Sequence, residues 1–258
     1  MNVDTLGIIG GTGWLGAGIA EAVLAEGLIE PGRLVLSNRS GSGPLSSRGV
    51  RIFTDNQQVV ELSEVVVLSI RPEQFRDLSI DARGKCVISL MAGIPAAAVA
   101  SATSGTVVRA MPNAAVQIRQ SFTPWYSAGR LAERHRSFVQ RLFECVGSAA
   151  EVPNEDCIDY LGALSGTGPA YPALLATALA HQAVAAGIPE GIARQAAQSV
   201  VVGSSQLLAQ RSPQALLEAL MAYRGVTAAA LESLVGEGFE AMVGRALDAG
   251  AEVARRGM

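Results

Sequence analysis

The feature that most constrains the fold of this chain is a glycine-spaced turn near its beginning. In the stretch IIGGTGWLGAGIAEAVL, Gly11, Gly13 and Gly16 follow a short β-branched run and open a segment with helical spacing. The first glycine permits a tight turn, the second lets the backbone approach a pyrophosphate, and the third allows close helix packing. Three glycines could make only a turn, but the strand before them and the helix after them favour a nucleotide-binding unit.

Apolar runs of strand length alternate with helical segments through the first 150 residues. The runs are short and rich in β-branched residues, and they lie at 5–11, 33–38, 65–70, 85–92, 106–111 and, more weakly, 147–153. Strands of this kind, separated by crossovers, predict a doubly wound parallel sheet. From Glu155 onward the sequence is alanine-rich with helical periodicity. We therefore predict an α/β chain with a Rossmann-type domain at 1–153 and an all-helical domain at 154–258.

Composition narrows the classes of partner. A net charge of −3 argues against a nucleic-acid surface. Cys86, Cys145 and Cys157 are odd in number and show no CxxC spacing, which indicates reduced, buried thiols in a cytoplasmic protein and no metal site. The beginning of the chain lacks a basic region followed by an apolar stretch, so we expect no signal peptide.

The helical half of the sequence favours a homodimer. Its helices are apolar on more than one face and short of charge, as in helices that pack against a second subunit. The stretch 171–188 is about membrane length, but it contains His181 and is better interpreted as a helix buried within a protein. We expect His181 in a core or an interface, and His135, in the charged run AERHR, at the surface.

The end of the second predicted strand indicates which dinucleotide binds. An NAD site places Asp or Glu there, whereas this chain reads LSNRSGSG and has no carboxylate. Arg39 can pair bidentately with a 2′-phosphate, beside Ser37, Asn38 and Ser40, although it could also stand on a solvated loop. NADPH is therefore expected in preference to NADH. In the glycine turn itself, Trp14 either shields the phosphates or packs beneath them.

A second anion site is expected in the stretch AYRGVTAAALESL, residues 222–234. Arg224, Gly225 and Thr227 stand at what is predicted to be the start of a helix, whose first amides have no partner and carry partial positive charge. A cation at that end is unfavourable unless an anion joins it. Arg224 could instead point to solvent, and Thr227 could be an ordinary N-cap.

Six segments of the sequence resemble the pyrroline-5-carboxylate reductase family in order and spacing. They are the glycine turn, SNRS at 37–40, IRP at 70–72, RAMPN at 109–113, LSGTGPAY at 164–171 and RGVTAAALESL at 224–234. The resemblance covers nearly the whole chain. It implies a Rossmann domain followed by a helical domain that dimerises by interleaving, with dimers that often assemble into a decamer.

The resemblance also implies an activity: the NADPH-dependent reduction of 1-pyrroline-5-carboxylate, a cyclic imine carboxylate, to L-proline. Thr227 would donate a hydrogen bond to the imine nitrogen, and the segment from Arg224 through Gly225 and Val226, with Asn113, would bind the substrate. The cofactor-binding residues would be Gly11, Thr12, Gly13, Trp14, Leu15, Gly16, Ser37, Asn38, Arg39, Ser40, Ile70, Arg71, Pro72, Ala92 and Asn113. Hydride transfer to a C=N bond requires no cysteine, histidine or metal.

The chain departs from the family pattern in its substrate half. Where the family has Ser-Pro-Gly-Gly-Thr-Thr, residues 222–227 read Ala-Tyr-Arg-Gly-Val-Thr, and Ala114 and Ala115 replace a Thr-Pro pair. The SGTGPAY segment could form the floor beneath the nicotinamide or a turn packed in the dimer. Two alternatives therefore remain: a reductase of another cyclic imino acid, or a non-catalytic NADP-binding protein.

Overall fold

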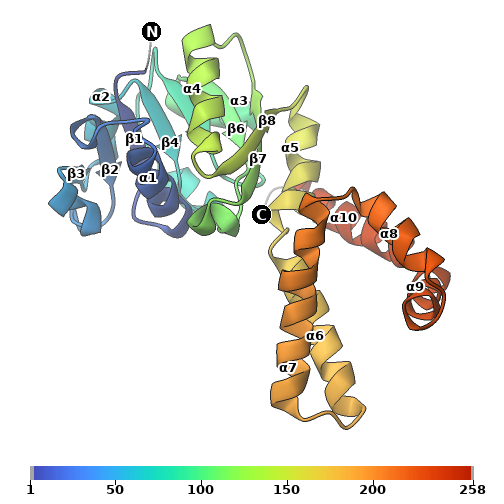
Figure 1. Cartoon of the computed structure of the whole chain (residues 1–258). Helices are drawn as coiled ribbons and strands as arrows, with labels where there is room; N and C mark the ends of the chain where they lie inside the picture. Colours follow the sequence, from blue (N-terminus) through green and yellow to red (C-terminus); the bar gives the residue numbers. More distant parts are fainter. Residues whose placement is uncertain (1–2, 257–258) are drawn as a thin grey trace. The chain divides into compact units, whose positions relative to one another are not determined.

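The structure, a computed structural model, describes residues 3–256 and forms two compact units (Figure 1). The first unit comprises the chain up to Thr167 together with the stretch from Asp248 onward. The second unit is Gly168–Leu247. The change from strands to helices falls where the sequence predicts it, since β8 ends at Glu151 and α5 begins at Glu155.

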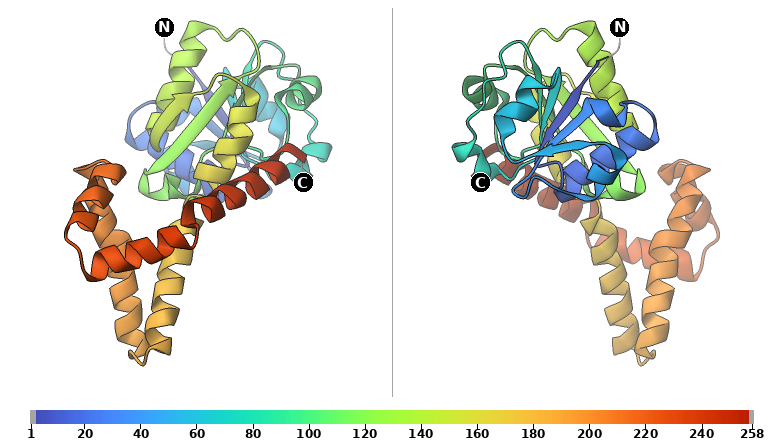
Figure 2. Two further views of the ribbon diagram at one scale, coloured as in Figure 1. Left: turned by 90° about the vertical axis from the view of Figure 1, so that its right-hand side faces the viewer. Right: turned by 90° about the vertical axis from the view of Figure 1, so that its left-hand side faces the viewer.

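The first unit contains, within residues 3–256, an eight-stranded sheet in the order β3-β2-β1-β4-β5-β6-β7-β8 (Figures 1 and 2). The strands are β1 (Leu6–Ile9), β2 (Leu34–Ser37), β3 (Arg51–Phe53), β4 (Val65–Leu68), β5 (Cys86–Ser89), β6 (Thr106–Ala110), β7 (Ser121–Ser127) and β8 (Gly147–Glu151). All neighbouring pairs are parallel except β6 and β7. The predicted α/β class is confirmed, and each of the six predicted runs contains a strand.

Two strands were not predicted from the sequence. β3 is only three residues long and lies at the edge of the sheet, where an exposed Arg51 interrupts the apolar signal. β7 contains Pro124 and mixes polar with aromatic residues, although it lies between β6 and β8. A proline within a run argues against an interior strand, so the usual signal is absent here.

Helices cover both faces of this sheet. They are α1 (Trp14–Ala25), α2 (Asn56–Glu61), α3 (Ala96–Thr103), α4 (Glu133–Glu144) and α5 (Glu155–Leu161). One buried cluster joins the sheet to α1 and α4 through residues such as Ile19 and Phe138. The other joins it to α2 and α3 through Val59 and Val99. Strands buried on both faces account for the nearly continuous Val, Ile and Leu runs of the sequence.

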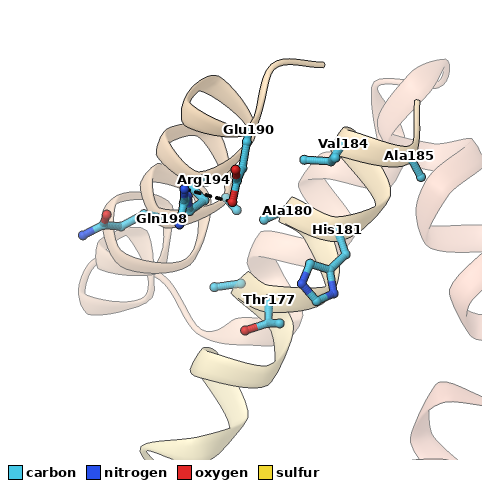
Figure 3. Close-up of a pocket in the computed structure, with 10 residues that line it drawn as sticks. Thr177, Ala180, His181, Val184, Ala185, Glu190, Arg194 and Gln198 are labelled. Carbon is cyan, nitrogen blue, oxygen red and sulfur yellow. Dashed lines mark ion pairs between the residues drawn. The ribbon is translucent and has the colours of Figure 1, made fainter. Parts of the chain in front are cut away.

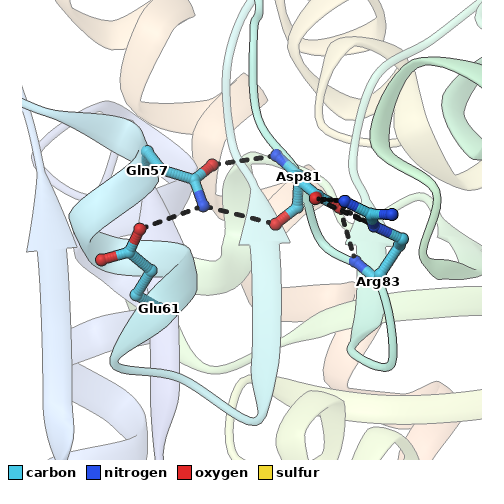
Figure 4. Close-up of polar contacts among 4 residues, drawn as sticks. All are labelled: Gln57, Glu61, Asp81 and Arg83. Carbon is cyan, nitrogen blue, oxygen red and sulfur yellow. Dashed lines mark hydrogen bonds and ion pairs between the residues drawn. The ribbon is translucent and has the colours of Figure 1, made fainter.

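Polar contacts hold α2 to the loop before β5 (Figure 4). The Gln57 side chain accepts a hydrogen bond from the Asp81 amide at 2.9 Å and donates one to the Asp81 carbonyl at 3.4 Å. Arg83 donates to both carboxylate oxygens of Asp81. The hydrogen bonds from Arg83 hold the pKa of Asp81 below its usual value. Both side chains are largely exposed, so this ion pair adds little to stability.

His135 is buried, contrary to the surface position predicted for it. Its Nε2 lies 2.9 Å from Oε1 of Glu64. His135 precedes Phe138, Val139 and Leu142 by three, four and seven residues, so it lies on the buried face of α4 despite its charged neighbours. That spacing is a signal from which the burial could have been predicted.

The second unit is helical throughout its described length. Its elements are α6 (Ala170–Ala185), α7 (Glu190–Gln198), α8 (Pro213–Ala222), α9 (Val226–Gly236) and the first part of α10 (Phe239–Arg256). Short π and 3-10 segments, Ser199–Gly203 and Ser204–Ala209, join α7 to α8.

Burial in the second unit is sparse. Along α6 only Ala180 is buried, while His181 and Leu174 are exposed. The burial predicted for 171–188 is therefore not achieved within this one chain. A core position for His181 is wrong, and its position in an interface stays a prediction. Among residues 3–256, no helix combines the length and apolarity needed to cross a membrane.

Candidate functional site

A cleft of about 740 Å³ opens at the carboxyl edge of the sheet in the first unit. It gathers ten of the predicted cofactor-binding residues: Thr12, Gly13, Trp14, Leu15, Ser37, Asn38, Arg39, Ser40, Ile70 and Arg71. The strand order reverses at β1, which pairs with β2 on one side and β4 on the other. In open α/β sheets ligands bind at this reversal, and here the cleft lies beside it.

The glycine turn between β1 and α1 leaves no room for side chains. Gly10, at φ +77°, has its missing Cβ 2.3 Å from the Ser69 carbonyl oxygen, and a Cβ on Gly16 would lie 2.6 Å from the Gly10 oxygen. Gly13 is the N-cap of α1 and has no side chain to cap the first amides. These amides are therefore free to bind an anion such as a pyrophosphate.

The loop after β2 is organised by Asn38. Its Nδ2 donates to the Ser42 carbonyl at 2.7 Å and to Oγ1 of Thr12 at 3.1 Å. Its Oδ1 accepts from the amides of Ser40 at 3.0 Å and Gly41 at 2.7 Å. Asn38 thus shapes the loop and ties it to the glycine turn, so that the neighbouring Arg39 and Ser40 line the cleft.

Two arginines give the cleft a positive charge. Arg39 and Arg71 are exposed, and neither has a salt bridge within the described part of the chain. They come from opposite sides of β1, one after β2 and the other after β4. Cationic side chains beside helix amides fit the charges of a phosphorylated dinucleotide, and the end of β2 carries no carboxylate to repel a 2′-phosphate.

Some predicted residues do not line this cleft. Gly11 lies behind it, against Leu36, and Gly16 faces the Gly10 carbonyl. Pro72 begins a 3-10 turn outside the lining residues. Ala92 lines a separate hollow of about 160 Å³ in the same unit.

Asn113 is buried and already engaged in the fold. Its Nδ2 donates to the Ser165 carbonyl at 2.7 Å, and its Oδ1 accepts from the Ala115 amide at 2.9 Å. Its own amide donates to Oγ of Ser121 at 3.0 Å. Asn113 therefore links the MPN turn to the SGTG segment, which explains its place in the motif on structural grounds.

The cleft also includes residues that the sequence analysis missed: Ile9, Gly10, Thr54, Asn56, Ser69, Gln74 and Leu90. Ser69 and Leu90 follow β4 and β5 directly, so the rule that ligands bind at the carboxyl edge could have identified them. Thr54 and Asn56 follow β3, which was not predicted, so no signal pointed to them. Asn56 accepts a hydrogen bond from Ser37 at 2.7 Å and thereby fixes one side of the cleft.

A buried ion triad fastens α5 to the sheet. The Arg109 side chain on β6 donates to Oε1 of Glu155 at 2.8 Å and to Oδ1 of Asp159 at 2.9 Å. Its Nε is buried without a hydrogen-bond partner among residues 3–256. Glu155 also accepts from the Ala96 amide at 2.7 Å, at the start of α3. The arginine of the RAMPN motif is thus a structural residue that joins three elements.

The segment 222–227 of the second unit is exposed. Arg224 has φ +51° and Gly225 has φ +105°, so the chain passes through left-handed backbone just before α9. Gly225 is the N-cap, and Thr227 is the second residue of the helix. No side-chain cap satisfies the first amides of α9 in the described chain, so the interpretation of Thr227 as an N-cap is wrong.

The pair α6 and α7 encloses another hollow, of about 660 Å³ (Figure 3). Thr177, His181 and Val184 line it from α6, and Glu190 and Arg194 line it from α7. Glu190 and Arg194 form an ion pair at 2.9 Å. None of the predicted site residues lies in this hollow. Its alanine-rich lining and exposed leucines nearby are typical of a surface that packs against another helix.

The environment of the three cysteines gives no indication of a catalytic or metal-binding role. All are free within residues 3–256, and burial raises the pKa of Cys86 to about 12 and that of Cys145 to about 11. Cys157 is only partly buried. In the same described part of the chain, no cluster of His, Cys, Asp or Glu side chains could hold a metal ion.

Comparisons with known proteins agree with this architecture. Residues 155–257 match the family described as pyrroline-5-carboxylate reductase dimerisation, and residues 5–93 match NADP oxidoreductase, coenzyme F420-dependent. A pyrroline-5-carboxylate reductase from Synechocystis is 29% identical, over 92% of this chain and 92% of its own length.

Solved structures extend the likeness to the whole fold. That of a pyrroline-5-carboxylate reductase from Coxiella burnetii superimposes with a TM-score of 0.84 at 25% identity, over 98% of each chain. That of a Plasmodium falciparum pyrroline carboxylate reductase with NADP bound superimposes with a TM-score of 0.81 at 20% identity, over 99% of this chain and 98% of that one.

The Rossmann unit, its glycine turn and its basic cleft define a dinucleotide-binding oxidoreductase with a helical second half. Within that class, the match of the helical half and the full-length relatives agree on one enzyme. The chain is similar to pyrroline-5-carboxylate reductases along nearly its whole length.

Proposed function

We propose that the protein reduces a cyclic imine that carries a carboxylate, with NADPH as the electron donor and 1-pyrroline-5-carboxylate as the substrate. The observation that supports this most strongly is the dinucleotide cleft in a chain that aligns along nearly its full length with relatives named for that reaction. L-Proline is the product. NADPH supplies the hydride when it is bound, and the protein positions the imine and polarises it.

The cofactor assignment rests on the charges around the cleft. Arg39 and Ser40 supply a cation and a hydroxyl donor at the end of β2, where an NAD site would have a carboxylate. The uncapped amides of α1 receive the diphosphate. Gly11, Gly16, Pro72, Ala92 and Asn113 complete the proposed cofactor site, the first two by shaping the turn. The Plasmodium falciparum pyrroline carboxylate reductase, solved with NADP bound, supports the same assignment.

The substrate site is proposed at residues 224–227. Gly225 has open space where a Cβ would stand, so an anion can approach its backbone and the amides that follow. Arg224 supplies the cation beside them, and Val226 presents its amide. Thr227 donates a hydrogen bond to the imine nitrogen and is the proposed catalytic residue. It is exposed, and as the second helical residue it does not cap the helix.

The assembly proposed is a homodimer through the helical domain at 154–258, with dimers joining into a decamer. The match of 155–257 to a dimerisation family and the sparse burial of the second unit both support the dimer. The proposed domain boundary at 153 follows the change of element type. The free cysteines support a reducing, cytoplasmic compartment.

Residues 222–227 depart from the family pattern, and this departure favours one alternative class of substrate. That class is a cyclic imino acid with another ring size or another pattern of ring substituents. Tyr223 and Val226 are 85% and 90% exposed, and they place large apolar groups beside the proposed carboxylate site. A non-catalytic NADP-binding protein is the remaining alternative.

One assay separates these functions. NADPH oxidation is followed with a panel of five- and six-membered imine carboxylates, after NADPH binding has been measured by calorimetry. Turnover of 1-pyrroline-5-carboxylate supports the proposal, and turnover of another ring only supports the alternative. Binding of NADPH without turnover of any imine would mean a non-catalytic protein.

Arg224→Ala tests the carboxylate site within the same assay. We expect the KM for the imine to rise roughly tenfold or more with a smaller fall in kcat, because the arginine binds the carboxylate equally in ground and transition states. Arg211→Ala, an exposed arginine just before α8, is the control. A KM that Arg224→Ala leaves unchanged would remove Arg224 from the site.

A further inference from the structure

Trp14 is an exposed aromatic residue at a position where the fold does not need one. It is the first residue of α1 and is 63% exposed. Its indole Nε1 has no hydrogen-bond partner among the residues that the structure describes. Packing beneath the glycine turn, one of the two roles that the sequence leaves open, therefore does not occur.

The indole stands between two hollows. Thr12, Gly13 and Trp14 line the cleft of about 740 Å³ and also a neighbouring groove of about 360 Å³. The groove continues along α1 to Gly18 and Glu21. Since space borders Trp14 on both sides, its ring can shift toward the cleft without displacing a packed side chain.

We propose that the Trp14 indole closes over the diphosphate of the bound dinucleotide and donates its Nε1–H to a phosphate oxygen; this inference rests on the proposed function. The first amides of α1 bind the diphosphate from the helix side, which leaves its other side in water. An indole combines one N–H donor with a large apolar face. It can thus satisfy a phosphate oxygen and exclude water from the charges at the same time.

The inference predicts a difference between two ligands. NADP⁺ carries the diphosphate, whereas adenosine 2′-monophosphate carries only the phosphate that Arg39 would bind. If Trp14 covers the diphosphate, removing the indole weakens the binding of NADP⁺ and leaves the binding of adenosine 2′-monophosphate almost unchanged. We expect Trp14→Ala to raise the Kd for NADP⁺ roughly tenfold, the size of one hydrogen bond to a charged group, and that for adenosine 2′-monophosphate less than about twofold.

Fluorescence tests the contact directly. The chain has two tryptophans, and Trp125 is 1% exposed with its Nε1 bonded to Gln140 at 2.8 Å. Acrylamide-accessible emission of the wild-type protein therefore comes from Trp14, as the Trp14→Phe protein verifies. Saturating NADP⁺ should protect this emission from acrylamide, and saturating adenosine 2′-monophosphate should not.

Two further variants sharpen the test. Trp14→Phe keeps an aromatic cover but loses the N–H, so its Kd for NADP⁺ should lie between those of the wild type and Trp14→Ala. Ile118→Ala is the matched control, because Ile118 is 70% exposed and lines neither hollow. Its Kd for NADP⁺ should equal that of the wild type.

The outcomes separate the two proposals. If calorimetry finds no NADP⁺ binding by the wild-type protein, the proposed function fails. If NADP⁺ binds but leaves Trp14 accessible to acrylamide, or if Trp14→Ala binds it as tightly as the wild type, the inference about Trp14 is wrong and the proposed function stands. If Trp14→Ala raised the Kd values of both ligands equally, the inference about Trp14 would also be wrong, because the variant would then have a damaged adenosine site.

Discussion

The two units of this protein differ in where their apolar surface is buried. In the first unit the strands β1, β2, β4 and β5 are buried on both faces, and side chains as large as Trp125, Phe143 and Leu142 are almost fully enclosed. In the second unit, the buried residues of the described chain are all alanines: Ala180, Ala193, Ala197 and Ala228. The first unit thus has a core of its own, whereas the second exposes leucines and valines that a folded protein normally covers.

This difference explains why one half of the protein is a complete domain and the other is not. A parallel sheet finds its packing partners in the helices of its own crossovers. A pair of alanine-rich helices buries too little area to be stable alone, so most of its stability must come from packing against further helices. We expect the first unit to lose stability when an internal contact is removed and the second when association is prevented.

The largest effect is expected at the buried triad of the first unit. Arg109→Met leaves the nearly buried carboxylate of Asp159 and the 31% exposed carboxylate of Glu155 without their cation, which should cost ~3 kcal/mol of unfolding free energy. Urea unfolding followed through the buried Trp125 measures it. Arg83→Met is the control, because it breaks an exposed arginine-aspartate pair and should leave the unfolding free energy almost unchanged. Equal losses from the two variants would contradict a structural role for the triad.

The second prediction concerns association of the helical unit. Leu174 on α6 is 70% exposed in the single chain, and a second copy would bury it. Leu174→Glu should weaken the proposed dimer by ~2 to 3 kcal/mol per copy, because it places a charge in an apolar contact. Analytical ultracentrifugation at several protein concentrations measures the shift toward monomer.

The control for this association test comes from the first unit. Leu62 is 38% exposed at the end of α2, and Leu62→Glu should leave the association state unchanged. If Leu174→Glu stays dimeric at the lowest concentration, α6 is not at the interface, and the contrast between the two units needs another explanation.

Sequence reasoning succeeded where a local pattern alone determines the structure. The glycine spacing, the β-branched runs and the missing carboxylate after β2 each reflect a backbone or charge requirement within a few residues, and the structure brings Gly13, Ser37 and Arg39 together at one cleft. It failed where the deciding contact lies far away in sequence. His135 stands in a charged run; its spacing along α4 could have predicted its burial, but no local pattern could identify its partner Glu64, which lies 71 residues away.

The helical half illustrates a second limit. Its periodicity predicts helices well and a buried helix at 171–188, but within this chain only Ala180 of α6 is buried. A sequence gives the amount of apolar surface and not the molecule that covers it. The role of Asn113 had a similar limit, since its bond to Ser165 spans 52 residues.

The third prediction tests whether the charge of Arg39 determines which dinucleotide the first unit binds. Arg39→Ala should weaken NADPH binding roughly tenfold and leave NADH binding unchanged, because the guanidinium pairs with the 2′-phosphate that only NADPH carries. Isothermal calorimetry with both nucleotides measures the two dissociation constants. Arg48→Ala, an exposed arginine outside the cleft, is the control. An equal loss for the two nucleotides would show that Arg39 contacts a group that they share.

The smallest effect on stability is expected at Glu64, which directly precedes β4 and contacts α4. Its carboxylate accepts from the Asp4 amide at 3.1 Å and lies 2.9 Å from His135 Nε2 and 3.0 Å from Arg134. Burial raises the pKa of Glu64, but the hydrogen bonds from His135 and Asp4 and the charge of Arg134 outweigh this, and the net pKa is lowered. The lowered pKa means that the ionised carboxylate is bound more tightly in the folded state, so its stabilisation is present above the unfolded pKa.

Glu64→Gln should therefore lower the unfolding free energy by ~1 kcal/mol at neutral pH, by removing the charge from its hydrogen bonds. The difference from the wild type should shrink as the pH falls below the unfolded glutamate value of about 4.3, because the wild-type carboxylate is then protonated as well. Urea unfolding across acid pH measures this, with the 88% exposed Glu133→Gln as control. A difference that persists unchanged at the lowest pH would mean that the shape of the side chain, and not its charge, joins α4 to the sheet.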